Sequence, residues 1–221
     1  MEALRCINFV LAVGDWAMIE GPNGSGKSTF LRAIAAQQSL DHGEIHLFGR
    51  PNNILRPAEI ARTVFYVNQN PLLGTAPDLT VLENLLVADA RVESHRASRV
   101  TLRDQYAALL TEAHLEDRLK QRVDTLSAGQ RQFLTLLIAE LRMVPLILLD
   151  EPFAALDEAN EALCLQKLQR LNASGRSLLH ITHDLEHSAV LGARRVRITE
   201  GVLTEQARVP NHSPPMASRS V

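Results

Sequence analysis

The stretch GPNGSGKST, Gly21–Thr29, decides the fold of this chain. Gly21, Gly26, Lys27 and Ser28 occupy the fixed positions of a P-loop. The apolar segment WAMIE precedes the stretch and is strand-like, whereas GKSTFLRAIAAQ reads as a helix. This strand–loop–helix context favours a phosphate-binding loop over a glycine-rich turn that is merely flexible.

The residue types of this loop suit a polyphosphate. Glycines let successive backbone N–H groups turn toward phosphate oxygens, and the start of the following helix attracts negative charge. Lys27 would pair with the β- and γ-phosphates, and Ser28 would give its hydroxyl oxygen to Mg²⁺. We therefore expect a nucleotide to contact Gly21, Pro22, Asn23, Gly24, Ser25, Gly26, Lys27, Ser28 and Thr29.

A second, acidic site is predicted at LILLDEP, Leu146–Pro152. Four apolar residues indicate a buried strand, and Asp150 at its end can bind Mg²⁺ through water. Glu151 can orient and polarise the attacking water as a general base. An acidic pair here also fits an ordinary helix N-cap, but its position after a P-loop favours the catalytic interpretation.

Strand-like and helical segments alternate along the chain, with strands expected at WAMIE, GEIHLFG, TVFYVNQ, VPLILLD and RSLLHITHD. This alternation predicts an α/β fold: a P-loop NTPase core whose mainly parallel sheet is flanked by helices. A hairpin, RVRITEGVLTEQ, predicts a small antiparallel β portion.

The domain boundaries follow from the same patterns. Residues 70–139 show helical periodicity without a convincing strand, so we expect an inserted helical subdomain there. The core is then expected from residues 1–69 and 140–206. The Pro- and Ser-rich end, residues 207–221, is expected to be disordered.

Composition narrows the classes of protein. The 221 residues include 23 basic and 25 acidic side chains, which argues against a broad nucleic-acid-binding face. Cys6 and Cys164 form no metal or redox spacing, which favours a reducing compartment. The start does not resemble a signal peptide, and the apolar runs fall short of the roughly 20 residues that span a bilayer.

The polar stretch TLSAGQRQF, Thr125–Phe133, contains no nucleophile and no metal-ligand cluster. Ser127 and Gln130 have the spacing of a capping box, and the apolar run behind them supports a helix. Taken alone, the stretch predicts only a helix start.

Gln69 and His183 each follow a predicted strand, and neither is diagnostic alone. A metal site built from His180, His183 and His187 is disfavoured, because their spacing straddles a strand-to-helix transition and no cysteine supports it.

Taken in order, these segments resemble the ATPase domain of ABC proteins over nearly the whole chain. The resemblance rests on the P-loop, Gln69, the LSAGQ signature at Leu126–Gln130, LILLDEP, AALD at Ala154–Asp157, and His183. In that family two domains pair head to tail, and each ATP lies between one P-loop and the other subunit's signature. The resemblance thus implies that Ser127, Ala128, Gly129 and Gln130 complete the partner's site.

Three more residues acquire roles through this resemblance. Gln69 would sense Mg²⁺ and the attacking water and touch the membrane partner. His183 would contact the γ-phosphate and stabilise its developing charge. Asp157 would link the two sites across the dimer, although it is equally compatible with an N-cap of the helix that follows.

Two features depart from the family pattern. Ala128 stands where the family usually has glycine, which is a small intrusion toward ATP. Members usually carry an earlier strand with an aromatic residue that stacks on adenine. Only twenty residues precede Gly21, so that strand is expected to be missing. Phe9 is expected to lie in the core rather than to replace that aromatic.

The segments NQNPLLGTAPDLTVLENLLVA and GQRQFLTLLIAE look like a bacterial importer group associated with tryptophan or other aromatic amino acids. The resemblance implies a cytoplasmic, homodimeric ATP hydrolase on the inner face of the membrane. Its partners would be a separate permease and a solute-binding protein, with no nucleic acid.

Two alternatives compete with this interpretation. A soluble ABC ATPase acting on nucleic acid or the ribosome usually has two fused domains or long coiled coils, and no sustained heptads occur here. An unrelated P-loop kinase or GTPase would leave the signature and His183 unexplained.

Overall fold

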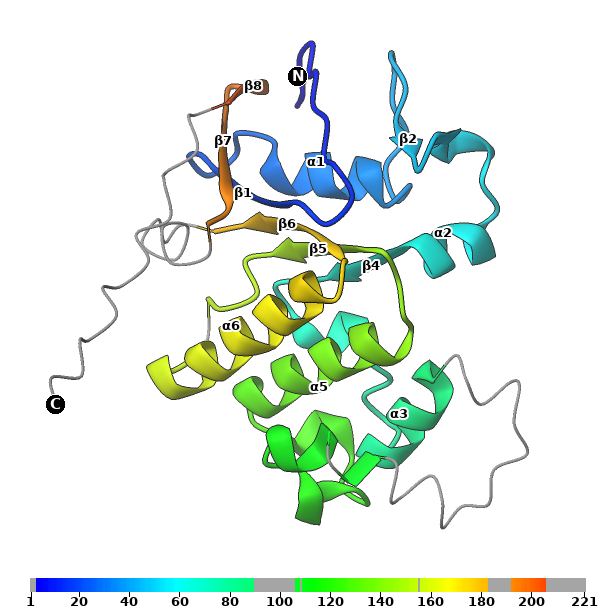
Figure 1. Ribbon diagram of the computed structural model, residues 1–221, viewed down its shortest axis with the longest axis vertical. Helices are drawn as coiled ribbons and strands as arrows, with labels where there is room; N and C mark the ends of the chain where they lie inside the picture. Colours follow the sequence, from blue (N-terminus) through cyan, green and yellow to red (C-terminus); the bar gives the residue numbers. More distant parts are fainter. Residues whose placement is uncertain (1–2, 90–105, 108, 155, 183–191, 206–221) are drawn as a thin grey trace, which may run out of the picture.

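The computed structural model describes residues 3–89, 106–107, 109–154, 156–182 and 192–205. A six-stranded sheet with the order β4-β5-β6-β1-β7-β8 lies at its centre (Figure 1). The strands are β1 Trp16–Glu20, β4 Val64–Val67, β5 Leu146–Asp150, β6 Ser177–Ile181, β7 Arg194–Thr199 and β8 Val202–Glu205. Neighbours from β4 to β7 pair in parallel, and β8 pairs antiparallel with β7. The predicted α/β class, its mainly parallel sheet and the hairpin at β7–β8 are confirmed.

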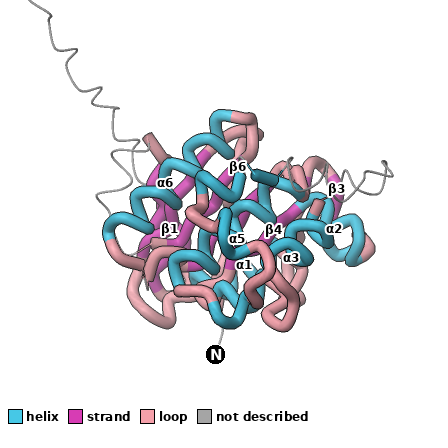
Figure 2. Tube along the Cα trace, turned by 90° about the horizontal axis from the view of Figure 1, so that it is seen from below, coloured by secondary structure: helices cyan, strands magenta, loops and turns pink. Residues whose placement is uncertain are grey.

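Helices cover both faces of the sheet. Helix α1, Lys27–Ile34, lies on one face, while α3 (Val81–Ala88), α5 (Ala128–Leu141) and α6 (Glu158–Ala173) lie on the other (Figure 1). Seen from below, α5 and α6 lie on the near side of the sheet (Figure 2). Successive strand residues feed two apolar clusters, with Leu148 packed toward α1 and Leu149 toward α5 and α6. Because both faces are covered, the central strands read as continuous apolar runs.

A two-stranded hairpin lies beside the main sheet: β2, His46–Leu47, pairs antiparallel with β3, Arg50–Pro51. The sequence predicts one strand, GEIHLFG, but the chain turns back at Phe48 and Gly49, which both have positive φ. Such a two-residue turn matches the twist of paired strands. The prediction of a single longer strand is therefore wrong.

Several short elements complete the described residues. Helix α2, Pro57–Thr63, was not predicted; it starts with proline, and the Arg56 N–H donates to Glu59 Oε2 at 3.0 Å. The 3₁₀ turns are η1 Asn52–Ile54, η2 Pro71–Gly74, η4 Glu116–Arg118 and η5 Val123–Thr125.

Between β4 and β5 the described residues form helices and turns and no strand, with residues 106–107 and 109–112 also helical. Buried Lys167 of α6 holds this region: its Nζ lies 3.1 Å from Glu112 and 2.5 Å from Glu140 of α5. Within the described ranges, no helix is both long and apolar enough to cross a membrane. The predicted tail, residues 207–221, lies outside them.

The described chain ahead of β1, residues 3–15, contains no strand. The Phe9 ring packs edge-on against Phe30 of α1, with ring centroids 5.7 Å apart, and the Arg194 guanidinium lies 4.8 Å from the Phe9 centroid. Phe9 packs against the apolar cluster around α1, as the sequence predicts.

Candidate nucleotide site

The candidate residues follow the carboxyl ends of neighbouring parallel strands. The P-loop follows β1, Gln69 lies two residues after β4, and Glu151 follows β5. Parallel strands end at the same edge of a sheet, so segments far apart in sequence meet there. The P-loop, Gln69 and Glu151 can therefore contribute to one site.

The P-loop is shaped by close backbone contact and by Lys27. A β-carbon on Gly21 would lie 2.0 Å from the Ile198 carbonyl oxygen, so only glycine fits there. Lys27 Nζ donates to the carbonyl oxygens of Gly21 (2.8 Å) and Pro22 (3.0 Å). Burial lowers the pKa of Lys27, while the nearby carboxylates of Glu151 and Asp150 oppose that shift. The ammonium thus lies inside the loop, where phosphate oxygens would meet it.

Asp150 accepts hydrogen bonds on both carboxylate oxygens. Ser28 Oγ donates to Oδ1 at 3.0 Å, and Tyr66 Oη donates to Oδ2 at 2.6 Å. Asp150 is only 7% exposed. Burial and the Asp150 carboxylate raise the pKa of the Tyr66 hydroxyl, so Tyr66 stays protonated as a donor. A serine hydroxyl beside a fixed carboxylate is the hard-oxygen set that Mg²⁺ prefers.

Sequence reasoning missed Tyr66. Its signal is weak but present: a residue with a polar tip occurs within the otherwise apolar segment VFYV, and β4 pairs with β5. A buried tyrosine hydroxyl usually finds a partner, and here the nearest acidic strand end supplies it.

Glu151 has a left-handed backbone, with φ of 48°. Its N–H donates to the Ile181 carbonyl oxygen at 3.2 Å, which anchors the turn to β6. Gln69 Nε2 donates to Glu151 Oε2 at 3.4 Å. Positive φ in a non-glycine residue costs energy and is held by surrounding structure. Glu151 also lines a cavity of about 160 Å³ with Phe153, His180 and Thr182.

The signature stretch forms the start of α5. Gln130 N donates to Ser127 Oγ at 3.2 Å and Ser127 N donates to Gln130 Oε1 at 3.1 Å, which confirms the predicted capping box. Ala128 is half-buried and Gly129 is buried. Helices α1 and α5 lie on opposite faces of the sheet (Figure 1). The chain therefore does not bring the signature and its own P-loop together into one site.

Asp157 caps α6, accepting from the Asn160 backbone N–H at 2.8 Å. Asp157 is therefore the N-cap of α6, as the sequence also allows. Hydrogen bonds from the Asn160 backbone and side chain hold the pKa of Asp157 below its usual range.

His183 and His187 lie outside the described residues. Within the part of the chain that the structure describes, no group of three His, Cys, Asp or Glu residues could hold a metal ion.

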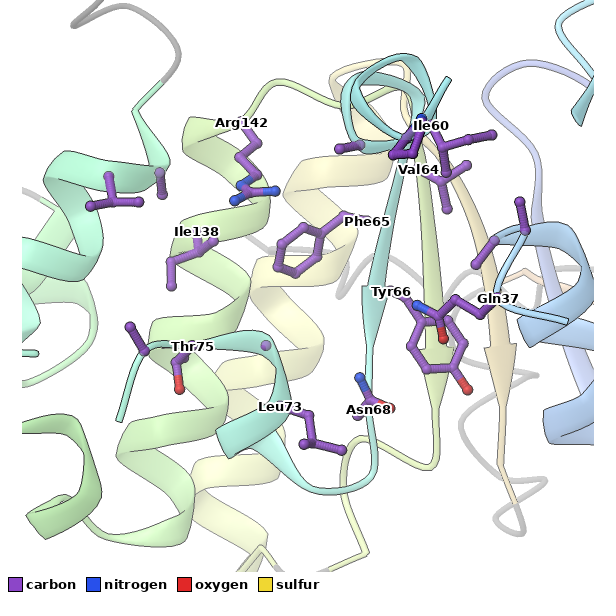
Figure 3. Close-up of a pocket in the computed structure, with 18 of the residues that line it drawn as sticks. Gln37, Ile60, Val64, Phe65, Tyr66, Asn68, Leu73, Thr75, Ile138 and Arg142 are labelled. Atoms are coloured by element: carbon purple, nitrogen blue, oxygen red, sulfur yellow. The ribbon is translucent and has the colours of Figure 1, made fainter. Parts of the chain in front are cut away.

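A mainly apolar groove of about 650 Å³ opens between β4, α2, η2 and α5 (Figure 3). In Figure 3 the Arg142 side chain lies over Phe65, whose ring centroid is 5.8 Å from the guanidinium carbon. Asn68, one residue before Gln69, belongs to the lining, as do the exposed side chains of Leu73 and Val87. The groove therefore adjoins the Gln69 segment.

Comparison with known proteins identifies relatives of this chain. The chain is 32% identical over 212 residues to the sn-glycerol-3-phosphate import ATP-binding protein UgpC of Vibrio vulnificus (strain YJ016), covering 95% of this chain and 54% of that protein. It therefore spans about half the length of this relative. It is 33% identical to the lipoprotein-releasing system ATP-binding protein LolD 2 of Rhodospirillum rubrum, covering 93% of this chain and 89% of the relative.

A third relative is the Nod factor export ATP-binding protein I of Paraburkholderia xenovorans, 36% identical over 88% of this chain and 62% of the relative. Among solved structures, the dimeric, ADP- and Pi-bound ATP-binding cassette MJ0796 superposes with a TM-score of 0.79 at 28% identity, covering 93% of this chain and 90% of that one.

The family description "ABC transporter" matches residues 4–154, which is more than half of the chain and includes the P-loop, the signature and the Asp150–Glu151 pair. With a mainly parallel sheet that carries the P-loop and the Asp150–Glu151 pair at one edge, the chain belongs to the ABC transporter family as an ATP-binding domain.

Proposed function

We propose that the chain is the ATP-binding subunit of an ABC transporter, which hydrolyses ATP at a head-to-tail dimer interface. The observation that carries the proposal is the pairing of motif residues at one sheet edge: Ser28 with Asp150 at 3.0 Å, and Gln69 with Glu151 at 3.4 Å. These contacts join three motifs separated in sequence. The solved cassette MJ0796, which is dimeric and binds ADP and Pi, supports assembly as a dimer.

In the proposed reaction, Lys27 and the P-loop amides hold the β- and γ-phosphates of ATP. Ser28, Asp150 and Gln69 would hold Mg²⁺, which when bound neutralises charge on the phosphates. Glu151 takes a proton from the attacking water, and Gln69 orients that carboxylate. His183 is proposed to contact the γ-phosphate.

The signature of the partner subunit completes each site in this proposal. Ser127 and Gly129 begin α5, whose N-terminal end favours an anion. Because α5 lies across the sheet from α1, its N-terminal end is proposed to complete the site of a second ATP-binding subunit rather than the site of its own chain. Residues 70–139 are proposed to form the helical subdomain that carries this signature.

The groove beside Gln69 is the proposed contact with a membrane permease, through a short helix of that partner. Leu73 and Val87 at its rim are 70% and 72% exposed, which leaves two large apolar side chains open to a partner beside the groove. An apolar groove rimmed by such residues suits an amphipathic helix. Membrane association and a solute-binding protein follow from the same proposal.

We propose import as the direction, since relatives such as UgpC are named import ATP-binding proteins. The likeness to the tryptophan and aromatic amino-acid group remains a hypothesis, because UgpC and LolD 2 are named for other cargoes. The described residues that are proposed to bind nucleotide do not determine which cargo is transported.

The experiment that tests the proposal is Glu151→Gln. This variant should bind ATP, form a stable dimer in gel filtration with ATP, and lose at least about 100-fold of its ATPase rate, as expected for loss of a general base. Glu116→Gln, an exposed residue of η4, is the matched control and should keep the parent's rate. Normal turnover by Glu151→Gln would overturn the role of Glu151.

A further inference from the structure

Two motifs assigned to the proposed dimer interface, the signature and Asp157, meet inside this chain. Helices α5 and α6 pack against each other, and their first turns carry Gly129 and Asn160. Asn160 lies between the signature and Asp157. No role for Asn160 follows from the motifs themselves.

The Asn160 side chain fills the space beside Gly129. A β-carbon on Gly129 would lie 2.6 Å from Asn160 Cγ, 2.8 Å from Oδ1 and 2.9 Å from Nδ2. These separations are shorter than van der Waals contact, so one side chain must move. Gly129 sits in a regular helix, so on this face Asn160, and not a special backbone angle, excludes a larger residue.

The same side chain is fixed from its other side. Asn160 Nδ2 donates to both carboxylate oxygens of Asp157, at 2.9 Å each, and the Asn160 backbone N–H donates to Oδ1 at 2.8 Å. Turning away from Gly129 would break the two side-chain bonds. Hydrogen bonds to a charged group are stronger than those between neutral groups.

We infer that Asn160 is a positioning residue that locks the signature end of α5 to Asp157, so that both approach the partner's nucleotide as one unit. The inference rests on the proposed head-to-tail dimer. Its basis is that the side-chain amide of Asn160 lies against Gly129 and donates to Asp157.

The first test needs no ATP. Thermal unfolding is measured for Gly129→Ala, Asn160→Ala and the double variant. Gly129→Ala should lower Tm by about 5 °C, as overpacking does in a chain of this size. With Asn160→Ala present, the same change should lower Tm by less than half as much. Equal losses in both backgrounds would overturn the proposed contact.

The second test separates the hydrogen bonds from packing. Asn160→Asp keeps the shape beside Gly129 but sets a carboxylate against Asp157. In the Glu151→Gln background, the ATP concentration for half-maximal dimerisation should rise about tenfold or more, as loss of a charge-assisted hydrogen bond predicts. The monomer's affinity for a fluorescent ATP analogue should change less than about twofold.

Asn172→Asp is the matched control at the other end of α6. Asn172 Nδ2 donates to the carbonyl oxygens of Gly14 and Arg176, both at 2.8 Å, so this variant also loses a half-buried amide donor. It should leave ATP-driven dimerisation unchanged. An Asn160→Asp variant that dimerises at the parent's ATP concentration would overturn the inference. If the Glu151→Gln protein without further changes never dimerised with ATP, the proposed function would be overturned. The Tm values of the Gly129 and Asn160 variants would still test the contact between these two residues.

Discussion

At the scale of single residues, the carboxylate of Asp150 depends on two neighbours of different kinds. Ser28 belongs to the P-loop and is a proposed Mg²⁺ ligand, whereas Tyr66 lies on β4 and reaches no phosphate in the proposed mechanism. Its hydroxyl instead fixes the direction of the Asp150 carboxylate at 2.6 Å. Partners behind a metal ligand orient that ligand and tune its affinity.

Tyr66→Phe removes this one hydroxyl and keeps the ring. We expect the Mg²⁺ concentration for half-maximal ATPase to rise about tenfold, the lower range for loss of such a partner. The free energy of unfolding should fall by about 1 kcal/mol. A magnesium titration of the ATPase rate and a denaturant melt measure the two effects.

Tyr106→Phe is the matched control, because the chain has two tyrosines and both donate to a buried aspartate. Tyr106 Oη donates to Asp89 Oδ2 at 2.9 Å in the helical region. This variant should lose similar stability without a change in Mg²⁺ dependence. If both variants shifted the magnesium midpoint alike, Tyr66 would have no special relation to the metal site.

At the scale of elements, α3 and α5 begin with the same device. Thr80 and Glu83 form the capping box of α3, and Ser127 and Gln130 form that of α5. Only the second is proposed to face a nucleotide. Comparing the two helices therefore separates the contribution of Ser127 to helix stability from its proposed contribution to ATP hydrolysis.

Ser127→Ala and Thr80→Ala should each destabilise the protein by about 1 kcal/mol, lowering Tm by about 2 to 4 °C, because each removes the acceptor of an N-cap. The ATPase rate and ATP-driven dimerisation should fall with Ser127→Ala and remain with Thr80→Ala. Equal losses of ATPase activity in the two variants would mean that Ser127 acts only as a helix cap.

The elements also show what the sequence could predict. The continuous apolar runs of β5 and α5 are visible in the sequence, and the cap of α5 follows from the spacing of Ser127 and Gln130. Helix α2 has no buried residue, so it carries no apolar stripe to detect. The sequence predicts one strand over residues 43–49 because polar and apolar residues alternate from Glu44 to Leu47, whereas the positive φ of Phe48, where the chain turns back, is seen only in the fold. Tyr66 and Asn160 were missed because their partners lie 84 and 31 residues away.

At the scale of the whole molecule, one short segment joins the proposed nucleotide site at the sheet edge to the groove. Asn68 lines the groove, and Gln69 donates to Glu151. A partner helix seated in the groove would therefore press on the residue next to Gln69. We propose that this segment links a partner bound in the groove to the position of Gln69, a link that stands on the adjacency of Asn68 and Gln69.

The groove is tested by combining Leu73→Glu with Val87→Glu in full-length, tagged protein expressed in the cells that encode it. Both side chains are mostly exposed, so folding and the ATPase rate of the purified chain should change little. The fraction that sediments with membranes should fall about tenfold, since two charges now face a desolvated apolar contact. Val13→Glu, at a site 73% exposed and outside the groove, should sediment like the parent. Undiminished sedimentation of the double variant would exclude the groove as the contact, whereas a parent that stays in the supernatant would instead remove the permease from the proposed function.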